Sequence, residues 1–270
     1  MEVLMSRNKI TIKDVAREAG VSTATVSYVV NNRMDIKISE ETRKKVLQVI
    51  NLLDYTPNQA AKALAANRKS LLAIYMEPSD SILCHAERMY ILNALTTYFH
   101  ENQYEIILLS DTALEKCDQA DAIICYNTSK KSFHKLGDNN FIPLVALDCV
   151  IDDPLFFQIN SDPKRLIDEA NAFFKGDSYS YVMLETQNEE KINLYKESLS
   201  MVTSVTSFED IKSLTGGNIL VTDYTLYELL KNDNHVCYVP AITKGTLAKV
   251  HECIEAALAR TPIDQHDVRI

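Results

Sequence analysis

One short stretch near the N-terminus carries small polar side chains at the spacing of a single helix face. Thr23, Ser27 and Asn31 repeat at every fourth position, and Ala24 and Tyr28 lie beside them. This face has no acidic residue, whereas an exposed helix face ordinarily carries charged side chains. Small hydroxyl and amide groups can enter a groove and reach base edges or phosphates. The pattern therefore predicts a helix that contacts nucleic acid.

Capping signals place this face on the second helix of a tight helix-turn-helix. Thr11 and Asp14 have the spacing of a capping box, which predicts a first helix from residue 12 to a glycine C-cap. Ser22 is the predicted N-cap of the second helix, over residues 23–31, and a third helix is predicted after Ser39. The apolar positions of the second and third helices form the expected core: Val26, Val29, Val30, Val46, Val49, Ile50 and Leu53.

The charge is divided unequally along the chain. Residues 1–70 hold 12 basic and 7 acidic residues, a net charge of +5, whereas residues 71–270 hold 16 and 30, a net charge of −14. A basic head on an acidic body is expected when only the head contacts a polyanion, because phosphate repels the body. An incidental surface imbalance is the alternative, and the pattern of the second helix favours nucleic acid.

Other kinds of chemistry lack their usual signals. The 270 residues include only six glycines and no G-x-G-x-x-G or G-x-x-x-x-G-K loop, so a phosphate-binding loop is not expected. The cysteines and histidines lack metal-ligand spacing, so we expect reduced thiols, no metal and no cofactor. The absence of an export signal and of a membrane-length apolar run predicts a cytoplasmic protein. No nucleophile elbow occurs, so an enzyme fused to the head is disfavoured.

Three blocks of sequence resemble the lactose-repressor (LacI/GalR) family of bacterial transcription regulators. They read T-I-K-D-V-A-R-E-A-G-V-S-T-A-T-V-S-Y-V-V-N-N, I-S-E-E-T-R-K-K-V and D-Y-T-P-N-Q-A-A-K-A-L-A, and the resemblance extends almost continuously from residue 11 to about residue 74. The resemblance implies a helix-turn-helix DNA-binding domain over residues 1–56, a hinge helix or linker over 57–70, and an effector-binding and dimerisation core over 71–270.

The resemblance also implies a homodimer that binds a palindromic operator in double-stranded DNA. The positions at which family members read bases in the major groove are Thr23, Ala24 and Tyr28. The positions at which they contact the DNA backbone are Thr11, Ser22, Ser27 and Asn31. Many members carry arginine where this chain has Tyr28, and arginine grips guanine with two hydrogen bonds. A different preference is therefore expected at that base pair.

The segment between the two predicted domains is rich in alanine. Residues 58–67 favour a helix and contain one large apolar side chain, Leu64, and so short a helix is marginal alone in water. Composition alone fits an inter-domain spacer. The resemblance implies instead a hinge helix that folds on the operator and inserts its leucine into the minor groove, which kinks DNA. The hinge positions assigned to the minor groove are Asn58, Ala61 and Leu64.

Short apolar runs alternate with amphipathic stretches through the rest of the chain, which predicts parallel sheets covered by helices on both faces. The resemblance implies an α/β periplasmic-binding-protein-like core of two subdomains, with the chain crossing near 155–160 and again near 235–245. The predicted strands are 71–76, 105–109, 122–125, 144–147, 181–184, 218–221 and 236–239. The predicted helices are 87–101, 163–174, 189–201, 226–230 and 245–259.

Several predicted strands end in acidic residues, and ligands of open α/β sheets bind beyond the carboxyl ends of the strands. The resemblance assigns effector binding to Asp148 and Asp223, and to Lys191 in place of the arginine of many members. Lys191 and Asp223 are expected to face one crevice that suits a hydroxyl-rich or anionic ligand. Ordinary turn residues are the alternative for each strand end: Glu77, Asp111, Asp148, Glu185 and Asp223.

These features predict a sequence-specific DNA-binding transcriptional repressor controlled by a small-molecule effector, such as a sugar or sugar phosphate. The body is shorter than is usual in the family, and lysine cannot form the two-pronged hydrogen bonds of arginine. The alternative is a DNA-binding regulator with an eroded effector pocket, whose core serves as a dimerisation or protein-docking module.

Overall fold

The structure of the chain is a computed structural model, and it describes residues 10–30, 36–53, 55, 71–110, 116–117, 119–263 and 265–270. The chain divides into two compact units, Met1–Arg68 and Lys69–Ile270. We call the first unit the head and the second unit the core.

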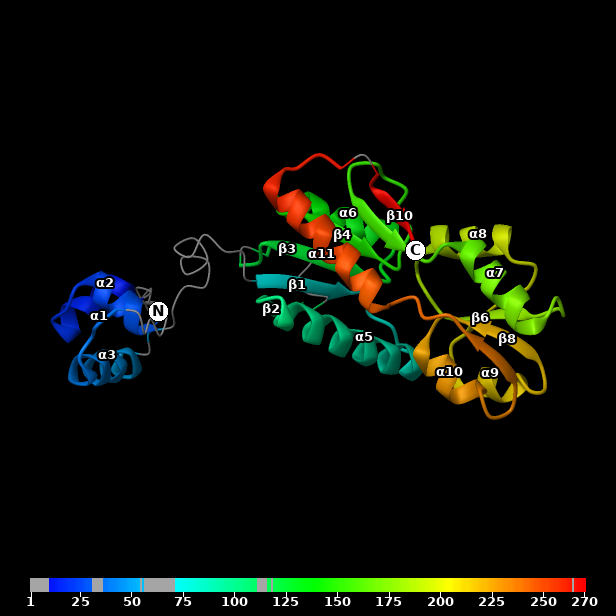
Figure 1. Cartoon of the computed structure of the whole chain (residues 1–270), viewed down its shortest axis with the longest axis horizontal. Coiled ribbons are helices and arrows are strands. Elements are labelled where there is room, and N and C mark those ends of the chain that lie inside the picture. Colours follow the sequence, from blue (N-terminus) through cyan, green and yellow to red (C-terminus); the bar gives the residue numbers. More distant parts are fainter. Residues whose placement is uncertain are drawn as a thin grey trace, which may run out of the picture. The chain divides into compact units, whose positions relative to one another are not determined.

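The described part of the head contains three short helices packed on small aliphatic side chains (Figure 1). Gly20 ends the first helix with φ +66°, a left-handed conformation that glycine adopts without strain. Ser22 and Ser39 accept hydrogen bonds from the backbone N–H groups of Thr25 and Thr42, so both predicted N-caps are confirmed. The helices are α1 Ile12–Ala19, α2 Thr23–Val30 and α3 Glu40–Leu52. The buried core consists of Val15, Ala16, Ala19, Val26, Val29, Val46 and Val49.

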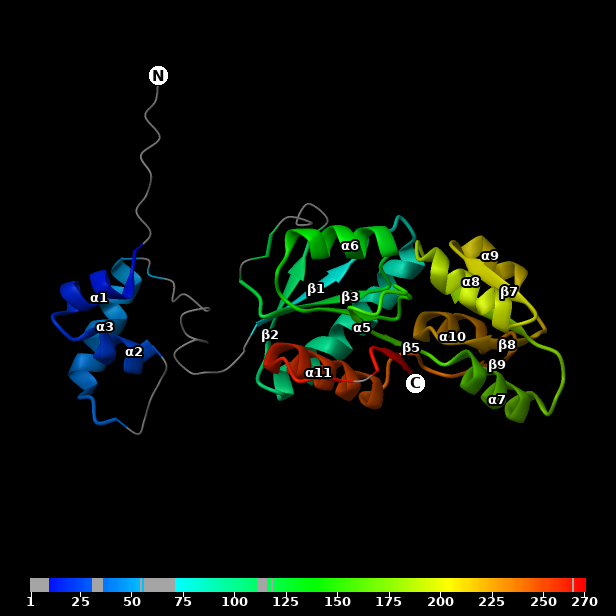
Figure 2. The same cartoon turned by 90° about the horizontal axis from the view of Figure 1, so that it is seen from above.

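The first lobe of the core is a six-stranded parallel sheet in the order β10-β5-β4-β3-β1-β2. Helix α6 covers one face, and α5 and α11 cover the other (Figure 2). The strands are β1 Leu71–Met76, β2 Glu105–Leu109, β3 Ala122–Tyr126, β4 Leu144–Leu147, β5 Phe157–Asn160 and β10 Asp267–Arg269. The helices are α5 Ile82–Glu101, α6 Lys130–Asn139 and α11 Lys244–Ala259.

The second lobe is a four-stranded parallel sheet in the order β7-β6-β8-β9. Helices α7 and α8 pack on one face, and α9 and α10 pack on the other. The strands are β6 Ser180–Leu184, β7 Val202–Val205, β8 Asn218–Val221 and β9 His235–Tyr238. The helices are α7 Pro163–Phe174, α8 Glu189–Ser198, α9 Phe208–Ser213 and α10 Tyr224–Leu230. The predicted fold class, a helical head joined to a two-lobed α/β core, is confirmed.

The chain passes between the lobes twice. It enters the second lobe between β5 and α7 and returns between β9 and α11. The first passage follows the predicted range of 155–160, because residues 157–160 form β5 of the first lobe. Helix α5 also joins the lobes, since Leu83 and Cys84 pack among side chains of the second sheet. The carboxyl ends of both sheets consequently meet where the lobes touch.

Five elements of the core were not predicted from the sequence: β5, β7, β10, α6 and α9. Helix α5 begins at Ile82, earlier than the predicted residue 87, because Ser81 caps it by accepting a hydrogen bond from the Cys84 N–H. None of the described helices is both long enough and apolar enough to cross a membrane.

Candidate functional sites in the head and in the core

The predicted DNA-contacting face lies on the open side of α2. Val26 and Val29 are buried against α1, which turns the opposite side of α2 outward. Thr23 and Ala24 are exposed, and Ser27 and Tyr28 are half-buried. Those four side chains could therefore reach a groove without unfolding the head. Asn31 lies outside the described residues, as do the hinge positions Asn58, Ala61 and Leu64.

The other two predicted backbone-contacting residues hold helix ends. The backbone N–H and the hydroxyl of Thr11 both donate to one Asp14 carboxylate oxygen, at 3.0 and 2.7 Å. These bonds, with the nearby Arg17 guanidinium at 2.8 Å, hold the pKa of Asp14 below its ordinary value. The Ser22 hydroxyl caps α2 at 3.1 Å. Both residues remain exposed at the head surface.

In the core, two of the predicted effector residues form a buried ion pair. Lys191, in the first turn of α8, places its Nζ 2.7 Å from Asp148 Oδ2, and the two side chains are only 7% and 5% exposed. Asp148 follows β4 with φ +55°, which aspartate tolerates better than most residues. Burial disfavours a charged lysine, yet the Asp148 carboxylate raises the pKa of Lys191 above its ordinary value. The pair joins the two lobes.

The third predicted effector residue, Asp223, lies near this pair and is also buried. It follows β8 in the second lobe, and its Oδ2 accepts a hydrogen bond from the Leu184 N–H at 3.1 Å. Burial raises the pKa of Asp223 to about 7; the Glu87 carboxylate adds to the rise, and Lys191 opposes it. The cluster holds three carboxylates, those of Glu87, Asp148 and Asp223, near one ammonium group.

Two residues that the sequence analysis did not single out connect the lobes. Asn188 is fully buried, and its side-chain amide donates to the carbonyls of Thr128 and Val150 at 2.9 and 3.0 Å. Glu87 on α5 accepts from the N–H groups of Tyr224 and Thr225, at 3.1 and 2.7 Å, where α10 begins. An asparagine directly before Glu189 is an N-cap signal for α8 and could have been noticed. The partner of Glu87 lies 137 residues away and has no local signal.

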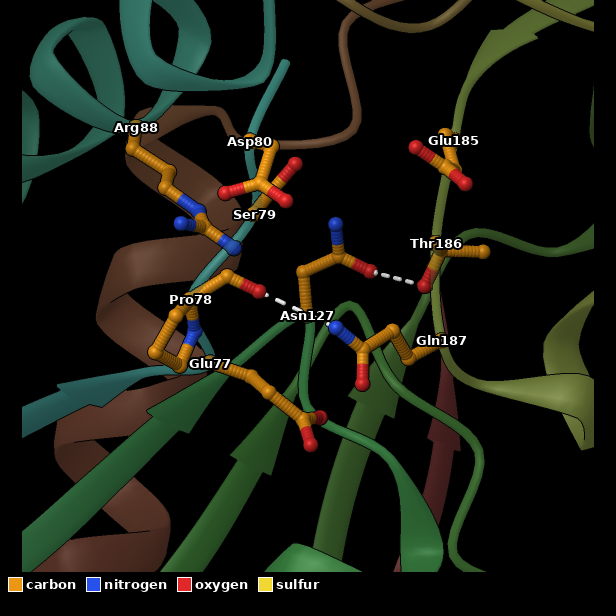
Figure 3. Close-up of a pocket in the computed structure, with 9 residues that line it drawn as sticks. All are labelled: Glu77, Pro78, Ser79, Asp80, Arg88, Asn127, Glu185, Thr186 and Gln187. Atoms are coloured by element: carbon orange, nitrogen blue, oxygen red, sulfur yellow. Dashed lines mark hydrogen bonds between the residues drawn. The ribbon is translucent and has the colours of Figure 1, made fainter. Parts of the chain in front are cut away.

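A cavity of about 280 Å³ lies between the lobes and is lined by residues from both (Figure 3). Two hydrogen bonds cross it, from the Thr186 hydroxyl to Asn127 Oδ1 at 2.6 Å and from Gln187 Nε2 to the Pro78 carbonyl at 3.0 Å. The predicted effector residues Asp148, Lys191 and Asp223 are not among the residues that line it. Instead the lining is Glu77, Pro78, Ser79, Asp80, Arg88, Asn127, Glu185, Thr186 and Gln187.

Comparison with known proteins gives matches over both units. Residues 11–58 match the family described as bacterial regulatory proteins, lacI family. Catabolite control protein A of Staphylococcus epidermidis is 33% identical over 174 residues, which cover 61% of this chain and 51% of that protein. The HTH-type transcriptional repressor PurR of Pasteurella multocida is 24% identical over 264 residues, covering 92% and 74%.

A solved structure of the lac repressor dimer, bound to operator and the anti-inducer ONPF, has the same fold. It aligns with a TM-score of 0.55 at 16% identity, over 97% of this chain and 96% of the other. The sequence of this chain also aligns with two further relatives, and these alignments cover 19% of catabolite control protein A of Streptococcus mutans and 64% of PurR of Mannheimia succiniciproducens. The chain thus spans less than two thirds of the length of several curated relatives that it matches.

A helix-turn-helix head, followed in the sequence by a core of two lobes with parallel sheets, defines a class of protein: helix-turn-helix proteins with a two-lobed α/β core. The match of residues 11–58 narrows this class. Residues 11–58 carry the domain of the lacI family of bacterial regulatory proteins, as the three sequence blocks predict.

Proposed function

We propose that this chain is a sequence-specific DNA-binding transcriptional repressor whose core responds to a small molecule. The observation that carries the proposal is the α2 face, which combines exposed Thr23 and Ala24 with half-buried Ser27 and Tyr28 and has no acidic residue. It lies within the segment that matches the lacI family. The names of two relatives, catabolite control protein A and the repressor PurR, agree with a regulatory role.

The partners proposed are a palindromic operator and a second copy of the chain, since the related lac repressor was solved as a dimer on its operator. The effector proposed from the sequence is a sugar or sugar phosphate.

The relatives are named as regulators, which favours a binding protein over an enzyme for this chain. No comparison supports the alternative in which the core binds no small molecule.

The proposal is tested by selecting operator sequences from a random library with the full chain and measuring their affinity over a range of salt concentrations. A palindromic consensus is expected, and its affinity should fall steeply with salt, because each neutralised phosphate releases counterions. A chain that enriches no sequence, or that binds with no dependence on salt, would contradict the proposal.

Tyr28→Ala is expected to relax the preference at one base pair of each half-site. Loss of a single base contact costs about 1–3 kcal/mol at that position. The matched variant Ser27→Ala, at a predicted backbone-contacting position one residue away, should weaken all operators about equally. Repeating the selection with both variants measures this. An unchanged consensus for Tyr28→Ala would remove Tyr28 from the base-reading set.

Leu64→Ala is expected to reduce DNA bending and specific affinity, because Leu64 is the one large apolar side chain of residues 58–67 and is proposed to insert at a base step. Bending is measured by the gel mobility of operator fragments with the site at different positions. Gln59→Ala, in the same segment but with no assigned contact, serves as the control. Equal bending by Leu64→Ala and the parent would end the wedge hypothesis.

A further inference from the structure

Most polar groups between the two lobes already have partners within the described part of the chain. Lys191 and Asp148 neutralise each other, and the Asn188 side chain is hydrogen-bonded to Thr128 and Val150 of the first lobe and to the Lys191 N–H of the second. The buried Glu77 carboxylate accepts hydrogen bonds from the Ser129 N–H and hydroxyl and from the Ser132 hydroxyl, at 2.5 to 3.0 Å. A ligand that used these groups would first have to break the protein's own bonds.

Three charged side chains that line the cavity have no such partner among the described residues. Asp80 and Arg88 line it from the first lobe and Glu185 lines it from the second, and none of their side chains makes a hydrogen bond or ion pair with another described residue. Figure 3 shows the Arg88 guanidinium and the Asp80 carboxylate on one side of the space and Glu185 opposite. The amide nitrogen of Asn127 points into the space between them.

The charges of these three side chains indicate the chemical class of the ligand. A guanidinium binds carboxylate and phosphate groups with two hydrogen bonds, whereas carboxylates accept hydrogen bonds from an ammonium group. A neutral sugar would bring no opposite charge to any of the three side chains. The volume of about 280 Å³ suits a small metabolite.

We propose that this cavity binds a small zwitterion, with its anionic group on Arg88 and its ammonium group between Asp80 and Glu185. The inference rests on the proposed function, since it names the chemical class of the effector. Two sources supply this chemistry: an amino sugar phosphate and a free α-amino acid. Because the ligand would contact both lobes, binding would favour the arrangement of the two lobes that forms this cavity.

The test is a calorimetric titration of the full chain with glucosamine 6-phosphate, with glucose 6-phosphate, and with each of the twenty common L-amino acids. The proposal expects binding of glucosamine 6-phosphate or of at least one amino acid, and these arms distinguish the two sources. Glucose 6-phosphate, which lacks the ammonium group, should bind about tenfold more weakly or not at all, because a hydrogen bond to a charged group contributes about this much.

Variants connect binding to the cavity. Glu185→Gln and Arg88→Gln should each weaken binding of the identified zwitterion about tenfold or more, whereas Glu197→Gln, an exposed carboxylate of α8 outside the cavity, should not. Binding of glucose 6-phosphate as tight as that of glucosamine 6-phosphate, the absence of binding by every probe, or unchanged affinity in Glu185→Gln would overturn the proposal.

Operator binding by the same preparation shows which of the two proposals fails, the repressor function or the zwitterion ligand. If the full chain selects an operator but a neutral sugar or glucose 6-phosphate controls it, the repressor proposal stands and the zwitterion proposal is wrong. If the chain selects no operator, the proposed function itself is wrong, whatever the cavity binds.

Discussion

Methionine in place of Lys191 is expected to lower the free energy of unfolding of the core by about 3–5 kcal/mol. The Lys191 ammonium lies 2.7 Å from the Asp148 carboxylate in an interface where both side chains are buried. Removal of the ammonium leaves Asp148 as an uncompensated buried charge near the carboxylates of Glu87 and Asp223. Urea unfolding of the full chain, followed by tyrosine fluorescence and by circular dichroism, measures the loss.

The matched control is Lys249→Met. Lys249 also contacts a carboxylate, that of Glu252, at 2.9 Å, but these side chains are 32% and 58% exposed. Water screens an exposed pair, so this substitution should cost only about 0–1 kcal/mol. The double variant Lys191→Met with Asp148→Asn should recover part of the loss, because it removes both charges. Equal losses for Lys191→Met and Lys249→Met would show that the buried pair does not hold the lobes together.

The stability of the core is expected to decrease as the pH rises from about 4 to about 7, with Asp223 as the main cause. Burial and the Glu87 carboxylate raise the pKa of Asp223 to about 7 in the folded chain. At a pH between the pKa of Asp223 in the unfolded chain and its pKa in the folded chain, the Asp223 carboxyl group is protonated in the folded chain and ionised in the unfolded chain. This contribution is therefore fully present below pH 4 and is lost by about pH 7, at up to about 1.4 kcal/mol per pH unit.

Asp223→Asn isolates this contribution. Asparagine keeps an oxygen that can accept the hydrogen bond from the Leu184 N–H but cannot ionise. The difference in unfolding free energy between this variant and the parent should therefore grow in favour of the variant from pH 4 to pH 7 and then become constant. Asp233→Asn, at an exposed carboxylate, should give a profile parallel to that of the parent. A parallel profile for Asp223→Asn as well would rule out Asp223 as the titrating group.

Much of the fold follows from local sequence patterns. The predicted bounds of β1, β2, β4 and β8 match the structure, because each is an unbroken apolar or nearly apolar run between polar residues. The head helices begin where their capping residues predict. These signals depend on neighbours within one turn of a helix or one strand, so they can be read before the chain folds.

The missed elements lack such local contrast. The edge strand β7 contains exposed Thr203 and Ser204, so its sequence does not read as a buried run. Helix α6 begins with two lysines and buries only Phe133 and Leu136. Strand β10 has three residues and exists through its pairing with β5, about 110 residues earlier in the chain. Pairing partners so distant provide the apolar surface and hydrogen bonds that the local sequence does not specify.

The lacI-family match of the head, the α2 face and the acidic ends of the strands could be predicted from residue types and short spacings, because these features depend on near neighbours in the sequence. Which charged side chains come together depends on the tertiary structure. Lys191 and Asp148 are 43 residues apart and neutralise each other because two lobes close on them, while Asp80, Arg88 and Glu185 line a cavity with their charges unpaired among the described residues. Coulomb energy depends on distance and burial, and both are set by the packing of the lobes.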